Sequence, residues 1–384
     1  MKSDSTDEET HKFQPAMIKR FYVHNFRSLQ NFELPAIGDS SALLIGRNGA
    51  GKSSVGMALE ILQRIGRGQN RIRDLIQPED ISQGLTDSPV RFELEVEIKE
   101  VQYTYSLALE LPEGFRELRV LEEKLTVGGE PKFKRKVAEV HFPRAGKKGE
   151  PMSFDWHLIW LSVAQTRTEK DPLDIFRKWL ARMLIVRPYP LGIFGDSSDE
   201  TLHPVPDMGN LGNWWNGVIA HSPASYSRIE QALKRMMPDL RDIKNPLIGV
   251  DSRNLEVHFD HGGKSALISF HLLSDGEKCM VIWALVMAAN EAYGPLLCFW
   301  DEPDNYLAIS EVGDFATDLR KAFKSGGQFL ATSHNAETIK SFSAENTYLL
   351  YRRNHQEPTQ VRALSELDYG KDLIGALVRG EVEP

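Results

Sequence analysis

The stretch GRNGAGKS, residues 46–53, decides the fold of this chain. It follows the short apolar run Ala42–Ile45 and precedes a segment with helical periodicity from Lys52 to about Ile65. Glycine lets backbone N–H groups turn inward, where a Cβ would block a close approach. The N-terminus of the following helix adds unpaired N–H donors and the positive end of the helix dipole. This order of strand, glycine-rich turn and helix predicts a phosphate-binding loop.

The loop fits the pattern G-x-x-x-x-G-K-S/T without a mismatch, and its residues have distinct chemical roles. The ammonium of Lys52 reaches the β- and γ-phosphates of a nucleotide and is a candidate catalytic group, and the hydroxyl of Ser53 is a ligand for Mg²⁺. We therefore expect ATP and Mg²⁺ to bind here. The alternative is a chance glycine-rich turn, which the flanking strand and helix disfavour. The candidate nucleotide-binding residues of the loop are Gly46, Asn48, Gly49, Ala50, Gly51, Lys52, Ser53 and Ser54.

Two later apolar runs also end in polar residues. LLCFWDE at 296–302 ends in Asp301 and Glu302, and FLATSH at 329–334 ends in His334. Buried parallel strands present their C-terminal ends to ligands. We therefore expect Asp301 to hold Mg²⁺ through water, Glu302 to polarise an attacking water, and His334 to sense the γ-phosphate or that water. The alternatives are a solvated turn for the two carboxylates and a structural hydrogen bond for the histidine.

The segment LSDGEK at 273–278 precedes the apolar helical stretch Cys279–Ala289. Ser274 and Glu277 have the spacing of a capping box, which explains the pair structurally. A second interpretation is functional: an open helix N-terminus with Ser274, Gly276 and Glu277 can bind an anion. It could then hold a γ-phosphate across a dimer interface.

These four motifs, in this order, resemble those of an ABC-type ATPase head, with LSDGE similar to the signature motif. NFRSL at 25–29 is similar to the opening strand of the RecF/SMC/OLD-like branch, the group of prokaryotic defence and repair ATPases that includes the PtuA type. The resemblance covers about residues 17–365 and is specific only at the motifs. It implies a homodimer with ATP bound between two heads. One protomer would contribute Lys52, Ser53, Asp301 and Glu302, and the other Ser274 and Gly276.

The spacing of the motifs separates the branches of that family. Ser274 lies 222 residues after Lys52 (274 − 52), far more than in transporter heads, so we expect an insertion. Sustained heptads are absent, which favours a globular insertion over a long coiled coil. About 50 residues follow His334, too few for a Toprim nuclease domain. We therefore expect a head that works with a separate effector such as a nuclease, with DNA as a further candidate partner, in anti-phage defence or DNA repair. The alternatives are a transporter ATPase subunit and a slow nucleotide-sensing scaffold.

The predicted fold class is α/β: an ATPase head with a mixed or parallel core sheet, an antiparallel β subdomain and a helical insertion. Residues 1–16 are expected to be a disordered tail. Residues 17–160 are expected to form a lobe with the phosphate loop and a β-rich sheet, and residues 161–254 a mainly helical insertion. Residues 255–384 are expected to form the lobe with the signature, the two carboxylates and His334.

The composition limits which partners and which cellular compartment we expect for this protein. With 46 Lys+Arg against 54 Asp+Glu the net charge is −8, which argues against general coating of DNA and leaves local basic segments at 64–73 and 132–148. For both segments a solvated surface is the alternative to contact with DNA. The longest apolar run has 11 residues and no secretory signal is present, so we expect a cytoplasmic protein without a membrane partner. Two cysteines exclude a disulfide framework, and Cys279 and Cys298 are expected to be buried.

Several features leave alternatives open. The resemblance implies a glutamine that senses Mg²⁺, for which Gln77, Gln83 and Gln165 are candidates, with Arg187 as a possible substitute. The segment PDNYLA at 303–308 lacks the Asp that many transporters place after this leucine, which puts the coupling between two sites in doubt. The pair His258 and His261 has too few neighbouring ligands for a convincing metal site. Trp214 and Trp215 are expected in a core or an interface.

Overall fold

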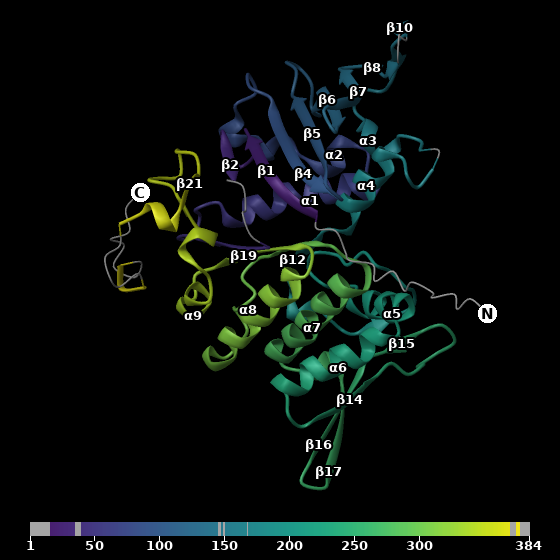
Figure 1. Cartoon of the computed structure of the whole chain (residues 1–384), viewed down its shortest axis with the longest axis vertical. Coiled ribbons are helices and arrows are strands. Elements are labelled where there is room, and N and C mark those ends of the chain that lie inside the picture. Colours follow the sequence, from purple (N-terminus) through teal and green to yellow (C-terminus); the bar gives the residue numbers. More distant parts are fainter. Residues whose placement is uncertain are drawn as a thin grey trace, which may run out of the picture.

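The computed structural model describes residues 16–34, 40–144, 147–148, 150–166, 168–368 and 374–376. Residues 1–15, where the tail was expected, lie outside the described residues, and Ala16 begins the first strand. Figure 1 shows two lobes stacked along the long axis, with strands above, mostly helices below, and a second sheet between them. The predicted fold class, a mixed α/β head with an antiparallel β subdomain, is confirmed.

The upper lobe, which we call the β lobe, contains an eight-stranded antiparallel sheet. Burial alternates residue by residue along its central strands, as expected for a sheet with one face toward a core. The turn at Gly128 and Gly129, expected from the sequence, joins two of these strands. In sheet order the strands are β11 (Met152–Ser153), β8 (Glu139–His141), β7 (Glu130–Lys136), β6 (Arg119–Val127), β5 (Val101–Glu110), β4 (Val90–Ile98), β1 (Ala16–His24) and β2 (Phe32–Leu34).

The second sheet, which we call the core sheet, has six strands. The first five are parallel and the last is antiparallel. Its central strands are buried along their whole length, which explains why they are continuous apolar runs in the sequence. In sheet order they are β12 (Leu184–Val186), β18 (Leu297–Trp300), β19 (Gln328–Ser333), β3 (Ser41–Ile45), β20 (Thr347–Tyr351) and β21 (Gln360–Ala363).

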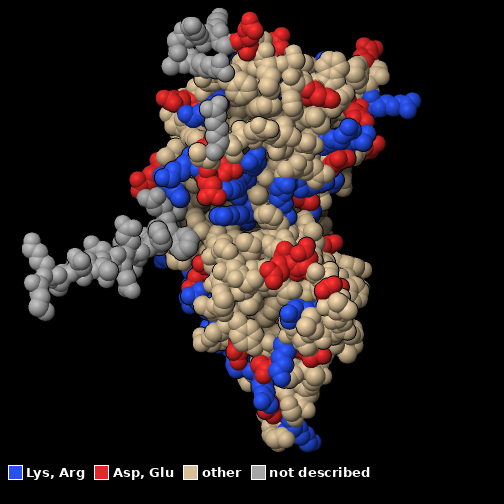
Figure 2. Space-filling model, turned by 90° about the vertical axis from the view of Figure 1, so that its right-hand side faces the viewer, with Lys and Arg blue, Asp and Glu red and all other residues tan. Residues whose placement is uncertain are grey.

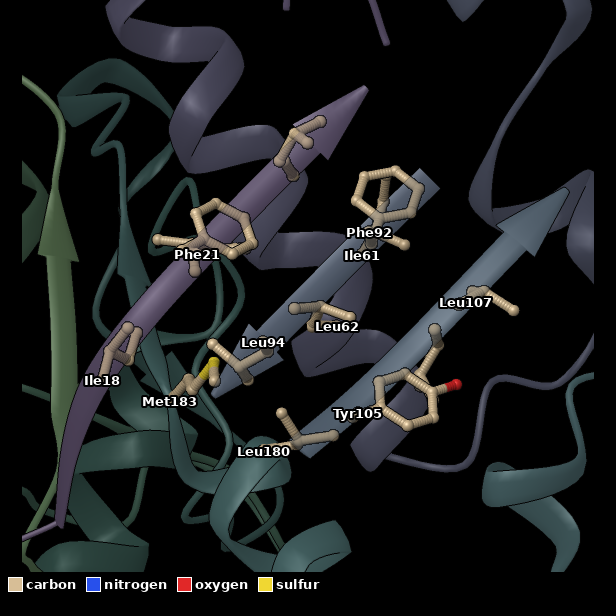
Figure 3. Close-up of a cluster of buried hydrophobic side chains, with 14 of the residues drawn as sticks. Ile18, Phe21, Ile61, Leu62, Phe92, Leu94, Tyr105, Leu107, Leu180 and Met183 are labelled. Carbon is tan, nitrogen blue, oxygen red and sulfur yellow. The ribbon is translucent and has the colours of Figure 1, made fainter. Parts of the chain in front are cut away.

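Helix α1 (Lys52–Gly66) fills the space between the two sheets. In Figure 3 its Ile61 and Leu62 lie beneath Phe21 and Phe92 of the β lobe. On its other side α1 approaches β18 so closely that a Cβ at Gly56 would lie 2.3 Å from the Phe299 ring. Packing on both faces fixes the helix, and with it the phosphate loop at its start, relative to both sheets.

The lower lobe, which we call the helical lobe, covers the other face of the core sheet (Figure 1). Trp214 and Trp215 are buried here, as predicted, and the Trp214 indole donates a hydrogen bond to the Tyr293 hydroxyl at 3.0 Å. The predicted burial of Cys279 and Cys298 is also confirmed. The helices are α5 (Leu211–His221), α6 (Ala224–Met236), α7 (Asp275–Tyr293) and α8 (Ile309–Lys324), with the short α9 (Ala336–Lys340) beside β19.

Residues 161–254, expected to be a mainly helical insertion, contain α4 (Pro172–Arg182), α5 and α6, and also β12. That strand pairs with β18, so part of this region belongs to the core sheet. A small sheet of β14 (Leu240–Lys244), β16 (Glu256–His261) and β17 (Lys264–Ser269) projects from the helical lobe (Figure 1). The remaining elements are α2 (Ile72–Leu75), α3 (Trp160–Val163), β9 (Pro143–Arg144), β10 (Lys147–Lys148), β13 (Asp196–Ser197) and β15 (Arg253–Asn254).

The longest helix in the described ranges is α7, with 19 residues, so no long coiled coil is present there. Within the same ranges no helix has both the length and the hydropathy needed to cross a bilayer.

Candidate nucleotide site

The phosphate loop has the backbone that its glycines predict. The φ angles of Gly46, Gly49 and Gly51 are +151°, +79° and +101°, in the region that favours glycine. At Gly46 a Cβ would also lie 2.2 Å from the carbonyl oxygen of Leu350 on β20. The loop therefore adopts this path only because these positions lack a side chain.

Lys52 lies at the start of α1 and is 6% exposed. Its Nζ donates a hydrogen bond of 2.8 Å to the carbonyl oxygen of Gly46, and no carboxylate of the described residues lies within ion-pair distance. An ammonium has three donors, so two remain for a ligand. Ser53 is exposed and Ser54 is half-buried on the same turn. A nearly buried cation without an acidic partner fits an anionic ligand such as a nucleotide phosphate.

The order of strands brings the other motifs to the same edge. β19 lies between β3, which leads into the phosphate loop, and β18, which ends before Asp301. Ile45 pairs with Ser333, and Ala331 pairs with Trp300. Because these strands are parallel, the loop, the two carboxylates and His334 all follow their C-terminal ends.

The two carboxylates are held from β19. The Thr332 hydroxyl donates to Asp301 Oδ1 at 2.6 Å and accepts a hydrogen bond from the backbone N–H of Glu302 at 2.9 Å. Glu302 has a φ of +51°, an uncommon backbone conformation for a residue other than glycine. Such residues concentrate at functional sites, because surrounding contacts must hold them in place.

The carboxylate of Glu302 is held at both oxygens. His334 Nδ1 lies 3.3 Å from Oε1, and Asn305 donates to Oε2 at 2.6 Å. None of the described Lys or Arg side chains forms an ion pair with it. The carboxylate is 27% exposed and the imidazole 58% exposed, so both can reach a ligand. Both oxygens of the carboxylate therefore have a partner, and neither partner is a lysine or an arginine.

Ser274 and Glu277 form the capping box that the sequence allowed. Glu277 Oε2 accepts hydrogen bonds of 2.7 Å from both the backbone N–H and the hydroxyl of Ser274, and the Glu277 N–H donates back at 3.3 Å. The carboxylate of Glu277 is therefore used within the cap. Ser274 is nevertheless exposed at the start of α7.

Exposed apolar side chains surround this helix start. The Lys278 ammonium donates to the carbonyl oxygen of Pro190 at 2.9 Å, which places the 189–191 segment beside α7, and a Cβ at Gly276 would lie 2.8 Å from the carbonyl oxygen of Tyr306. We name the surrounding side chains the apolar collar. Its members are Tyr189 (58% exposed), Leu191 (69%), Leu272 (68%), Tyr306 (40%) and Ile309 (74%). Exposed apolar side chains that gather at one place are typical of interaction surfaces.

The NFRSL motif forms a turn beside the phosphate loop. Asn25 is 1% exposed, has a φ of +56° and donates to the carbonyl oxygens of Leu85 and Ser88 at 2.8 and 2.7 Å. Arg27 forms an ion pair of 2.8 Å with Asp80. The motif thus ties the 80–88 loop to the opening strand.

The loop between β20 and β21 completes the site, and sequence reasoning missed it. Thr359 Oγ1 donates to the carbonyl oxygen of Ala50 at 2.9 Å, and Arg352 Nη1 donates to that of Gly49 at 3.3 Å. No motif or spacing marks these residues, which lie about 300 positions after the phosphate loop. They border a pocket of about 190 Å³ lined by Arg27, Ser28, Ser82, Gln83, Arg352, His355, Glu357 and Pro358.

The four candidates for the Mg²⁺-sensing position lie in different places. Gln83 lines this pocket and donates to the carbonyl oxygen of Gln356, whereas Gln77 donates to that of Arg73. Arg187 forms an ion pair with Glu60 of α1, and Gln165 is exposed. Only Gln83 of these four lines the pocket beside the phosphate loop.

The two basic segments are less exposed than their sequences suggest. Arg135 is completely buried, so it belongs neither to a solvated surface nor to a surface that could contact DNA, the two alternatives for this segment. Arg67 donates to the carbonyl oxygens of Ala181 and Pro204, and burial lowers its pKa to about 10. Arg71 and Arg73 are exposed, and the side chains of Arg144, Lys147 and Lys148 lie outside the described residues. Figure 2 shows Lys and Arg side chains gathered at the waist between the lobes.

His258 has a structural partner. Its Nδ1 lies 3.0 Å from Asp242 Oδ1, and no group of three or more metal-ligating side chains occurs in the described part of the chain.

The core sheet and the motifs at its edge define an ABC-type ATPase head, a class in which this edge binds ATP. The chain belongs to the RecF/RecN/SMC N-terminal domain family, whose model matches residues 17–358. It is similar in fold to an SMC head bound to the C-winged helix domain of ScpA, with 16% identity and a TM-score of 0.56 over 91% of this chain and 99% of that one. The SMC head of Pyrococcus furiosus with an extended coiled coil, bound to the C-terminal domain of ScpA, gives 14% identity and a TM-score of 0.54 over 96% and 99%. No curated protein sequence matches significantly.

Proposed function

We propose that this protein hydrolyses ATP between two copies of its head and uses the cycle to control a separate effector. The observation that carries the proposal is the convergence of four groups at one edge of the core sheet. Lys52 presents an ammonium that has no acidic partner among the described residues, Asp301 and Glu302 present carboxylates, and His334 contacts Glu302. Phosphate binding and water activation need these groups together.

The residues divide the chemistry. Lys52 would leave the Gly46 carbonyl and bind the β- and γ-phosphate oxygens, while the loop N–H groups bind the others. Ser53 and Asp301 would hold Mg²⁺, which neutralises charge on the phosphates. Glu302 would accept a hydrogen bond from the attacking water and then take its proton. His334 and Asn305 would keep the carboxylate in place. The imidazole of His334, more exposed than Glu302, would contact the γ-phosphate.

The apolar collar supports the dimer. Ser274 lies within an exposed apolar surface, which a monomer would leave in contact with water. In the proposed dimer the collar packs against the partner, and the start of α7 binds the γ-phosphate held by the partner's phosphate loop. The hydroxyl of Ser274 would then exchange Glu277 for a phosphate oxygen.

The pocket beside the phosphate loop supports a nucleotide rather than a simple phosphate. It continues from the loop and is lined by polar and charged side chains on two sides, Arg27 and Ser28 from the NFRSL turn and Arg352 and His355 from the β20–β21 loop. We propose that it receives the sugar and base.

Family membership favours action on or near DNA, in defence or repair, over a role in a transporter. One fold relative is described as bound to the winged-helix domain of another protein, so a head of this architecture can hold a protein partner. For this chain we propose a separate effector such as a nuclease, with the basic waist in Figure 2 as a surface suited to a polyanion.

The test uses Glu302→Gln, which keeps the shape of the site and removes the base. We expect this variant to form ATP-dependent dimers, measured by multi-angle light scattering, and to release phosphate at about a hundredth of the wild-type rate or less. Lys52→Ala should neither dimerise with ATP nor release phosphate. Monomeric Glu302→Gln at saturating ATP would contradict the two-head model, and wild-type phosphate release no faster than that of Lys52→Ala would contradict hydrolysis.

A further inference from the structure

The segment that joins β20 to β21, residues 352–359, holds two carbonyl oxygens of the phosphate loop. Thr359 is 2% exposed, and its Oγ1 donates to the carbonyl oxygen of Ala50 at 2.9 Å. Arg352 is half-buried, and its Nη1 donates to the carbonyl oxygen of Gly49 at 3.3 Å. The two side chains therefore hold two consecutive peptide groups of the loop.

A hydrogen bond to a carbonyl oxygen also sets the direction of the N–H group in the same peptide. A trans peptide is planar, so its C=O and N–H bonds point in opposite directions. Because Thr359 holds the Ala50 oxygen, the Gly51 N–H points away from Thr359, and it donates to no other group of the described residues. Backbone N–H groups exposed in this way bind the oxygens of an anion. Thr359 therefore leaves the loop with an oriented, unused donor.

Arg352 acts on the preceding peptide. The N–H of that peptide, on Ala50, donates to the carbonyl oxygen of Arg47 at 3.1 Å and closes a turn of the loop. Two other nitrogens of Arg352 bind its own segment: Nε donates to the carbonyl oxygen of Glu357 at 2.8 Å, and Nη2 donates to that of His355. A planar guanidinium can hold three oxygens in one fixed geometry, whereas a lysine ammonium on its flexible chain cannot. Arg352 thus fixes the turn of the loop relative to β20 and β21.

Thr359 lies so close to the loop that only glycine fits opposite it. A Cβ at Gly51 would lie 2.3 Å from Thr359 Oγ1 and 2.8 Å from Ser28 Oγ. The hydroxyl oxygens of Ser28 and Thr359 lie 2.9 Å apart. A hydroxyl has one proton and the Ala50 carbonyl can only accept, so the Thr359 proton goes to Ala50 and Ser28 donates to Thr359. The Thr359 hydroxyl therefore has defined partners on both sides and cannot rotate away from the loop without losing them.

We infer that Thr359 and Arg352 are positioning residues for nucleotide binding: they hold the Ala50 and Gly49 oxygens and so keep the loop N–H groups directed at the phosphates. The inference deepens the proposed function and rests on it. Neither residue belongs to the four motifs, and Thr359 lies just beyond the residues that the family model matches. A loop held in its binding shape does not have to reorganise when the nucleotide arrives, which strengthens binding.

The first experiment uses Thr359→Val, which keeps the shape of the side chain and removes its proton donor. We expect the Kd for ATP and for ADP, measured by titration calorimetry, each to rise about tenfold. The KM for ATP should rise with them while kcat changes less than about twofold, because ground and transition states lose the same binding. Thr359→Ser keeps the hydroxyl and should bind as wild type does. So should the matched control Thr126→Val, at a half-buried threonine on β6.

The second experiment separates the geometry of Arg352 from its charge. We expect Arg352→Met and Arg352→Lys both to raise the Kd for ATP and ADP about three- to tenfold, because neither side chain can hold three carbonyl oxygens. Arg353→Met, at the exposed neighbouring arginine, is the control and should bind both nucleotides as wild type does. Wild-type affinity in Arg352→Lys would show that this residue acts through its charge alone and would overturn its positioning role.

Urea unfolding of the same preparations separates positioning from stability. A loss of stability with unchanged Kd and KM in Thr359→Val and Arg352→Met would show that the contacts are purely structural. It would overturn the inference and leave the proposed function intact. If one of these two variants fails to fold, the other decides. Wild-type protein that binds ATP no more tightly than Lys52→Ala would instead overturn the proposed ATP site, and the inference with it.

Discussion

Glu123 in the β lobe and the acids at the edge of the core sheet have their charges treated in opposite ways. In the β lobe Glu123 is completely buried and fully partnered. It accepts hydrogen bonds of 3.0 Å from Tyr105, 2.8 Å from the Trp160 N–H and 2.9 Å from the Leu161 N–H, and Arg135 lies 3.6 Å away on the neighbouring strand. Arg135 in turn donates to the carbonyl oxygens of three residues, which are Val137, Leu158 and Asp155.

At the edge of the core sheet the acids Asp301, Glu302 and Asp304 are held only by neutral donors and by His334. Among the described residues no arginine or lysine pairs with any of them. The difference teaches how to distinguish a structural acid from a functional one. A structural acid has its charge compensated inside the fold, whereas a functional acid keeps capacity for a metal, a water or a moving segment.

Removing the cation from the Glu123–Arg135 pair should have the largest effect on the stability of the protein. Arg135→Met would leave Glu123 buried without its cation, which we expect to lower the free energy of unfolding by about 3–5 kcal/mol. The measurement is the urea midpoint and slope by circular dichroism. Lys134→Met, next to it on the exposed face of β7, should change stability by less than about 0.5 kcal/mol. Equal losses in the two variants would contradict the comparison.

Neutralising Glu302 at the edge of the core sheet should lower the rate of ATP hydrolysis and leave the free energy of unfolding almost unchanged. Glu302→Gln keeps an acceptor for Asn305, so we expect its free energy of unfolding to stay within about 0.5 kcal/mol of wild type. Phosphate release should nevertheless fall about a hundredfold or more. Stability and activity are to be measured on the same preparation. A destabilisation comparable to that of Arg135→Met would place Glu302 among the structural acids.

The apolar collar predicts a surface effect of intermediate size. In the Glu302→Gln background, Leu272→Asp should raise the apparent dissociation constant of the ATP-dependent dimer by about tenfold or more, since a buried leucine contributes about 1.5–3 kcal/mol. Sedimentation velocity over a concentration series measures it. Leu267→Asp on β17 is the control, because Leu267 is also exposed (56%) but lies outside the collar. Equal effects of the two substitutions would remove the collar from the interface.

The compensated centre also predicts a pH dependence. Burial raises the pKa of Glu123 above its usual value, against the opposing effects of its N–H donors and Arg135. A carboxyl whose pKa is raised on folding contributes stability below its unfolded pKa and loses it as the pH rises through the folded pKa. Without Arg135 that pKa rises further, so the deficit of Arg135→Met should be smaller at pH 5 than at pH 8, by about 1 kcal/mol.

Urea unfolding at the two pH values measures this shift. The double variant Glu123→Gln with Arg135→Met has no acid at this site, and its deficit should be the same at both pH values. A deficit of Arg135→Met that grows on acidification would reverse the sign and exclude Glu123 as its source.

The smallest effect is expected at the two cysteines, which should hardly react with a thiol reagent in the native protein. Burial raises the pKa of Cys279 to about 12 and that of Cys298 well above its usual range. Both thiols lie in the helical lobe and core sheet, away from Glu123. Native protein should therefore react with a thiol reagent at pH 8 only as fast as it unfolds. Rapid labelling of both thiols in native Arg135→Met would show that a substitution in the β lobe also opens the helical lobe and the core sheet. The two parts of the fold would then not be stabilised separately.

Much of the site was predictable because its signals are local. The phosphate loop, the two carboxylates and His334 each follow an apolar run, and parallel strands of that kind must end at one edge. Burial of Arg135 also had a signal: Phe133 and Arg135 alternate with exposed lysines, so they share the inward face of β7. Composition alone hid this, because a run of basic residues suggests a solvated strand.

The bonds of Asp304 and the position of the β20–β21 loop had no comparable signal. Asp304 binds hydroxyls about 30 residues away, and Thr359 reaches a loop more than 300 residues away. Both contacts depend on which strands are neighbours, and strand order is a product of tertiary packing.

The sequence by itself determined the local elements: where a backbone turn needs glycine, which runs become buried strands, and which helix begins with a capping box. Those outcomes follow from φ/ψ restrictions and hydrophobic periodicity over a few residues. Only the tertiary structure decided which charges are compensated. Arg135 meets Glu123 because their strands pair in that register, and Asp304 has no cation among the described residues because β19 and α9 bring it only hydroxyls. Burial and pairing depend on the whole fold, and they distinguish an acid that stabilises the protein from one available for function.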